Sequence, residues 1–193
     1  LKDYKINAQP MFSWCKSEMT VPNIQSITVN EAHSSNPPPV VVATVNVRSS
    51  LNPTTIKNEV CMITIAHHNN FPIDQPAPRP QFQKHFCGYT RPKSQNWPVD
   101  IKARHEEFKI TKIVKADSER ELLSWFLATF KSIDPDLIVV NDANDCQLDV
   151  IWDRINNSNI SNWSCLGRLK FRNKNKWKWD NVIIGRMVCD VKG

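Results

Sequence analysis

The sequence contains few glycines, only four among 193 residues. This excludes a Gly-rich loop that cradles phosphates with its backbone N–H groups. Long apolar runs are missing too: the richest is Val40-Val41-Val42-Ala43, far short of the roughly 20 residues that cross a bilayer. The N-terminus also lacks the apolar core of a signal peptide. We therefore expect an intracellular protein with no membrane partner.

The six cysteines do not form a metal-binding pattern, since no pair has Cys-x-x-Cys spacing. Several lie beside apolar residues, which indicates a reducing compartment where cysteine serves as a small hydrophobic residue. A zinc site made from His67, His68, His85 and Cys87 is the alternative. No further ligand has matching spacing, so we interpret these as strand residues and predict no metal site.

Length and hydrophobic pattern predict one α/β domain with a modest appendage. Residues 1–36 are polar and turn-rich, and Pro37-Pro38-Pro39 marks a boundary because proline cannot donate to a sheet ladder. Beyond it, strands are predicted at residues 40–48, 59–67, 83–90, 108–114, 137–140 and 185–191, and helices at about 118–133 and 147–156. The first two strands are expected to pair as a hairpin. Strands followed by alternating helix and strand predict a mixed sheet with helices packed against it.

Positive charge is concentrated in one segment. The net charge is +6, and six basic residues with no acidic one lie between Arg168 and Trp179. Lysine and arginine neutralise phosphates, while tryptophan stacks on unpaired bases. A nucleic-acid contact is thus predicted for Arg168, Lys170, Arg172, Lys174, Lys176, Trp177 and Lys178. The alternatives are a solvated loop, or a strand with one charged face and a packed tryptophan face.

Short motifs spread along the chain carry a family resemblance. They lie at residues 36–43, 78–87, 134–139 and 185–191, at Ser13-Trp14-Cys15-Lys16, and in the spacing from Trp163 to Lys170. Together they resemble the exonuclease-like domain of family-B DNA polymerases, in particular the alpha type of eukaryotes. The resemblance implies a ribonuclease-H-like mixed β-sheet flanked by helices. It also implies that residues 1–36 are the end of an N-terminal domain and a linker, and that 37–193 are an exonuclease-like domain truncated at its C-terminal end.

The resemblance bears directly on metal binding. Proofreading members carry an Asp-x-Glu pair on the first strand and an Asp at the helix after the Asp-Pro-Asp strand. Motif matching puts Asn46 and Arg48 at the pair and Gln147 at the helix, and the fourth acid falls beyond Gly193. Two-metal hydrolysis needs several carboxylates to hold ions about 4 Å apart. Neutral amides bind hard cations weakly, and a guanidinium repels them. The resemblance therefore implies an inactive 3′-to-5′ exonuclease site with no catalytic residue.

Two alternatives stay open. Asp142, Asp145 and Asp149 flank Gln147, and a register slip would present one of them to a metal in a residually active, metal-dependent exonuclease. Leu148 lies on the apolar face that fixes the helix, so structural or solvated roles for these acids are favoured. The other alternative is a pure protein-interaction scaffold.

The resemblance also implies properties of an intact polymerase. It would be a nuclear enzyme that extends RNA primers with DNA at replication initiation, bound to primase subunits, an accessory B subunit and RNA–DNA primer-template. It would use Mg²⁺ in a palm domain and Zn²⁺ in C-terminal modules, neither encoded here, and this segment would need no cofactor. For this segment, a structural and template-guiding role is expected, and whether it is an enzyme by itself is open.

Overall fold

The computed structural model describes residues 5–6, 11–28, 37–93, 100–142, 147–173 and 178–191. Its centre is a six-stranded mixed sheet in the order β6-β5-β4-β3-β7-β8. The strands are β3 (Val40–Asn52), β4 (Lys57–Phe71), β5 (Lys84–Thr90), β6 (Thr111–Ala116), β7 (Leu137–Val140) and β8 (Met187–Asp190). β3, β4 and β5 are antiparallel neighbours, whereas β6, β7 and β8 join their neighbours in parallel. The predicted mixed α/β fold is confirmed and is consistent with a ribonuclease-H-like exonuclease domain.

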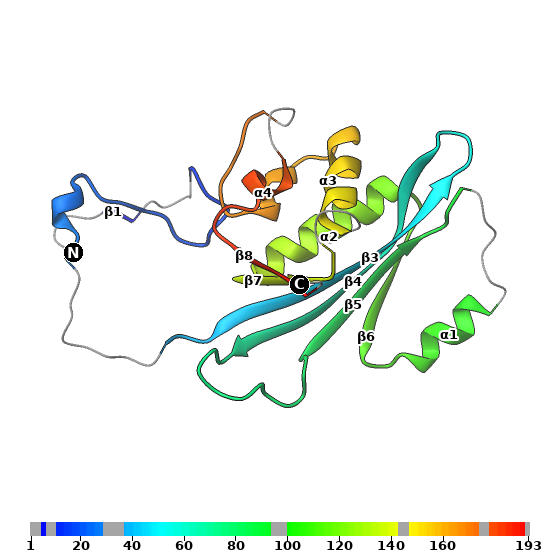
Figure 1. The fold of residues 1–193 in the computed structure, drawn as a ribbon, viewed down its shortest axis with the longest axis horizontal. Helices are drawn as coiled ribbons and strands as arrows, with labels where there is room; N and C mark the ends of the chain where they lie inside the picture. The colour runs from blue at the N-terminus through cyan, green and yellow to red at the C-terminus, as the bar shows by residue number, and fades with distance from the viewer. Residues whose placement is uncertain are drawn as a thin grey trace.

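One face of the sheet is covered by helices. Figure 1 shows α2 (Glu119–Ile133), α3 (Leu148–Asn157) and the short α4 (Trp179–Val182) along the same side of the strands. The interface between the layers is apolar and fully buried, with Ala43, Val45, Ile63, Ile65 and Ile138 from the sheet and Leu122, Phe126, Phe130, Ile151 and Ile155 from the helices. We call this the helix-covered face, and the opposite one the open face.

The helix α2 begins and ends where its sequence predicts. The Ser118 side chain accepts a hydrogen bond from the Glu121 backbone N–H at 3.2 Å, which is the bond expected of a capping box. The helix ends at Asp134, which has a left-handed backbone (φ 49°). Leu122, Phe126 and Phe130 then fall on one buried stripe, so the predicted helical period is confirmed.

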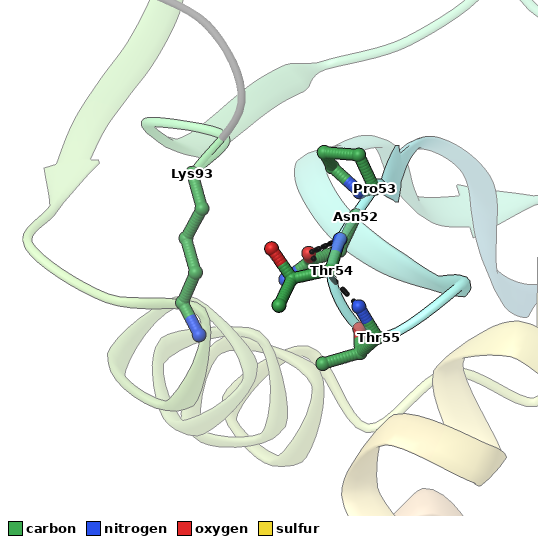
Figure 2. Close-up of a pocket in the computed structure, with 5 residues that line it drawn as sticks. All are labelled: Asn52, Pro53, Thr54, Thr55 and Lys93. Carbon is green, nitrogen blue, oxygen red and sulfur yellow. Dashed lines mark hydrogen bonds between the residues drawn. The ribbon is translucent and has the colours of Figure 1, made fainter.

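The hairpin of β3 and β4 is confirmed and is longer than predicted. Beyond a bulge at Arg48/Ser49, pairing continues to Asn52 and Lys57. Figure 2 shows the reason the turn holds: the Asn52 side-chain oxygen accepts the backbone N–H groups of Thr54 (2.9 Å) and Thr55 (3.3 Å). Asn52 also donates to Glu59 at 2.8 Å. Polar residues with low β-propensity thus extend the strands through turn bonds.

The helix α1 (Ile101–Glu107) was not predicted, and the strand expected from residue 108 begins instead at Thr111. Residues 108–110 form a turn in which the Thr111 N–H donates to the Phe108 carbonyl at 3.0 Å. Part of this apolar stretch, residues 108–110, therefore forms a turn, and the strand begins only after it. The remaining elements are short: β1 (Lys5–Ile6), β2 (Met19–Thr20), η1 (Ile24–Ser26) and η3 (Trp163–Leu166).

Part of the N-terminal region packs on the helix layer. Ser13 and Leu169 form an isolated β-bridge, and the Trp14 N–H donates to the Arg168 carbonyl at 2.8 Å. The Trp14 indole N–H donates to the Ser164 hydroxyl at 3.1 Å. The domain division at residue 36 stays a prediction, because these contacts do not show where one folding unit ends. None of the helices in the described ranges combines the length and the apolar character that a membrane span requires.

Candidate nuclease face and candidate nucleic-acid interface

Asn46 and Arg48 lie on the same face of the sheet, as strand alternation predicts for residues two apart, and this is the open face. Asn46 and Arg48 are exposed, whereas Val45 before them and Val47 between them are buried against the helices. Across the β3–β4 ladder, Asn46 pairs with Thr64 and Arg48 with Met62. The first-strand position therefore presents an amide and a guanidinium to solvent, and neither supplies the anionic oxygen that a hard cation needs.

Gln147 lies elsewhere, at the N-cap of α3 in the helix layer. Its side chain is buried (5% exposed), and its amide oxygen has no hydrogen-bond partner among the described residues. A carboxylate in this place would be buried without a partner, at a cost of several kcal/mol, unless a cation neutralised it. The structure thus keeps Gln147 away from the exposed surface that carries Asn46 and Arg48.

Of the three acids that flank Gln147 in the sequence, the structure describes Asp142 and Asp149. Asp149 is exposed beside Asp153 in a shallow depression, and the Asp142 N–H donates to the Asp190 carboxylate at 2.9 Å. Asp145 lies outside the described residues. Over the described ranges, no three His, Cys, Asp or Glu side chains gather in a way that would hold a metal ion.

The described parts of the basic segment, residues 168–173 and 178–179, lie on the helix-covered side, next to η3 and α4. Arg172 and Lys178 are exposed there, and the Lys170 ammonium lies 5.1 Å from the centre of the Trp14 ring. Lys174, Lys176 and Trp177 fall outside the described residues. The candidate nuclease face and the described residues of the predicted nucleic-acid set are therefore on opposite sides of the sheet. One short strand would have to pass around an edge to contact both.

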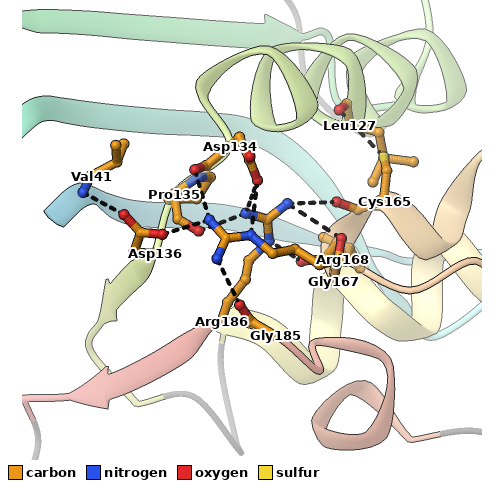
Figure 3. A network of polar contacts seen from close by, with 11 residues as sticks. Val41, Leu127, Asp134, Pro135, Asp136, Cys165, Gly167, Arg168, Gly185 and Arg186 are labelled. Atoms are coloured by element: carbon orange, nitrogen blue, oxygen red, sulfur yellow. Dashed lines mark hydrogen bonds and ion pairs between the residues drawn. The ribbon is translucent and has the colours of Figure 1, made fainter. Parts of the chain in front are cut away.

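Arg168 differs from its neighbours because two carboxylates hold it (Figure 3). Its guanidinium donates to Asp136 at 2.6 Å and to Asp134 at 3.2 Å, and also to the Gly185 carbonyl at 3.1 Å. Burial opposes ionisation of Asp136, but its bonds with the Val41 N–H and Arg168 outweigh this and lower its pKa. In the free domain these bonds give Arg168 a structural role. Its contact with nucleic acid stays a prediction.

Arg186 completes this ion network, which sequence reasoning missed. Its side chain is 1% exposed and donates to Asp134 at 2.7 Å and to the carbonyls of Pro135 (2.6 Å) and Leu166 (2.9 Å). Burial lowers the pKa of Arg186 despite the adjacent Asp134. The signal was present in the sequence, because the Asp-Pro-Asp and Gly-Arg-Met motifs carry opposite charges. The network ties the end of α2 to β7, η3 and β8.

Comparison with known proteins agrees with this geometry. A family model for the exonuclease domain of family-B DNA polymerases matches residues 1–191. The chain belongs to this family. It is 44% identical over 98% of its length to the DNA polymerase alpha catalytic subunit of Drosophila melanogaster. The corresponding proteins of Xenopus laevis and Mus musculus are 34% and 33% identical to it, both over its whole length.

The resemblance expected from the motifs is thus confirmed. The chain spans 13% of the length of each of these insect, frog and mouse proteins. The names of these relatives describe them as catalytic subunits of DNA polymerases. Because the chain matches only a small part of each, the activity and partners of a whole polymerase are proposals for this chain.

Proposed function

We propose that this domain is inactive as a 3′-to-5′ exonuclease and serves a replicative DNA polymerase of the alpha type as a scaffold and a guide for single-stranded template. One observation carries the proposal: the first-strand positions present Asn46 and Arg48 on one exposed face, while Gln147 is buried in the helix layer. Metal-dependent hydrolysis on this face would need other ligands.

In this proposal the intact polymerase extends RNA primers with DNA at replication initiation in the nucleus, with primase subunits and an accessory B subunit as partners. Its Mg²⁺ and Zn²⁺ sites belong to other parts of that polymerase. The similarity to alpha catalytic subunits over nearly the whole chain supports this assignment. An inactive exonuclease domain is compatible with an enzyme that makes short starter stretches.

The guiding role is assigned to the basic segment, where exposed Arg172 and Lys178 flank the residues outside the described ranges. Phosphate contacts by such side chains make binding depend steeply on salt concentration. Arg168 adds to this surface only if its bonds to Asp134 and Asp136 open.

Fluorescence anisotropy of labelled single-stranded DNA across a salt series tests this role in the intact polymerase. We expect the combined Arg172→Ala and Lys178→Ala changes to weaken binding and to reduce the salt dependence by roughly one to two phosphate contacts. Arg79→Ala, an exposed arginine on the loop after β4, is the matched control. If the variants changed neither binding nor its salt dependence, the guiding role would be wrong and only the scaffold role would remain.

A further inference from the structure

The open face carries a groove that the sequence reasoning did not anticipate. It has a volume of about 470 Å³ and lies between the sheet and α1. Its walls include Arg48, Met62, Tyr89, His105, Phe108 and Ile113. This volume is within the roughly 300–1,000 Å³ of pockets that hold small organic molecules.

Strand pairing explains why these side chains meet. Arg48 pairs with Met62, and Met62 pairs with Tyr89, so the three lie in a row across β3, β4 and β5 on the open face. Ile101, His105 and Phe108 follow each other at helical spacing along α1 and its end, and so close the groove from the side. The groove therefore rests on the sheet itself and not on a loose loop.

The walls are aromatic and apolar. The rings of Tyr89 and His105 meet edge to face, with centroids 5.1 Å apart, and Phe108 stays 57% exposed at the rim. An exposed aromatic ring beside packed ones offers a surface on which a flat ring can stack.

The charge at the groove is positive. Among the described residues that line it none is acidic, whereas Arg48 carries a guanidinium. Within the described parts of the chain, Arg48 forms no ion pair, in contrast to Arg168 and Arg186. Its guanidinium is thus free to hold a planar or tetrahedral anion, which it binds with paired N–H groups.

We propose that this groove binds a single unpaired nucleotide, with the base against Phe108 and the aromatic wall and the phosphate on Arg48. A base has apolar faces and polar edges, and an open groove lets the faces stack while the edges stay in water. The proposal takes its ligand class from the proposed function, but it uses the sheet face opposite the described part of the basic segment. A free nucleotide and one nucleotide of a strand share this chemistry.

Photo-crosslinking of the intact polymerase tests the groove and separates the two sources. One arm uses a single-stranded oligonucleotide with one 4-thiothymidine, and the other uses free 4-thiothymidine monophosphate. We expect adducts on residues 101–113 or on β5, identified by peptide mass spectrometry. Adducts in the first arm alone assign the groove to a strand, and adducts in the second arm assign it to free nucleotides.

The variants Arg48→Ala and Phe108→Ala should each reduce the adduct yield about tenfold, the effect of one charge-assisted bond or one stacked base. Both side chains are exposed, so folding should survive, which the thermal midpoint checks. Arg79→Ala is the matched control and should leave the yield unchanged.

Adducts only outside the groove, or yields that neither variant changes, would overturn the proposal. This test is separate from that of the proposed function. The Arg172 and Lys178 variants should weaken binding of the strand, but the strand that still binds should form the groove adduct.

Discussion

At the scale of single residues, the contacts of Arg186 predict a large contribution to stability. Its guanidinium is buried and is held by the Asp134 carboxylate and by backbone carbonyls from two separate segments. Replacing it with methionine removes this donor from the Pro135 and Leu166 carbonyls and leaves Asp134 with Arg168 as its remaining ion partner. We expect Arg186→Met to lower the free energy of unfolding by about 3–5 kcal/mol in urea titrations.

The control is Arg168→Met in the same network. Arg168 is 25% exposed, so water replaces part of what is lost, and we expect a cost of about 1–2 kcal/mol. Equal costs at the two positions would show that burial does not set the strength of this network.

His67 makes stability depend on pH. Its ring is buried (7% exposed), and neither nitrogen has a hydrogen-bond partner within the described ranges. Burial lowers the pKa of His67, and the charges of Lys84 and His68 lower it further. Because the unfolded chain takes up a proton that the folded chain resists, stability is complete above about pH 6.5 and is lost as the pH falls below it.

Urea titrations between pH 8 and pH 5 measure this effect. We expect up to about 1.4 kcal/mol of lost stability for each unit by which folding lowers the pKa. The His67→Gln variant does not titrate there and should show a flatter dependence, with pH 8 as the reference. The same slope in both proteins would assign the pH dependence to other groups.

At the scale of elements, the turn of the β3–β4 hairpin contains a strained residue. Ile56 is 79% exposed and has a left-handed backbone (φ 51°), which a β-branched side chain rarely adopts. Glycine adopts this conformation without the clash, so Ile56→Gly should stabilise the protein by about 1 kcal/mol.

Ile56→Ala is the matched control, because it removes the exposed side chain but keeps the Cβ atom. It should move the urea midpoint less than Ile56→Gly does. A larger gain with alanine would mean that the exposed isoleucine, and not the backbone, is the source of strain.

The elements that the sequence predicted are those with a strong local signal. The Ser118 cap and the spacing of Leu122, Phe126 and Phe130 specify α2 without help from the rest of the fold. The helix α1 lacks such a signal, because its Ile101 and His105 face a groove built by distant strands. Contacts with distant strands determine whether such a helix forms, and these contacts cannot be predicted from the local sequence pattern of a single chain.

At the scale of the whole molecule, the sheet separates two surfaces. The motif match placed Asn46 and Arg48 on one face, and strand alternation was enough to predict that. It was not enough to predict that Gln147 is buried or that the described part of the basic segment lies on the opposite side, since both depend on how α3, η3 and α4 pack. Ion pairs such as Arg168 with Asp136 span 32 residues and were also beyond local reasoning.

A nuclease time course tests the central claim, that this face has lost its metal ligands. The intact polymerase is incubated with single-stranded DNA labelled at the 5′ end, with Mg²⁺ or Mn²⁺ and without nucleotides, and the products are resolved to one nucleotide. We predict that the strand keeps its full length. A ladder shortened from the 3′ end, lost in Asp142→Asn or Asp149→Asn but kept in Arg48→Ala, would contradict the account.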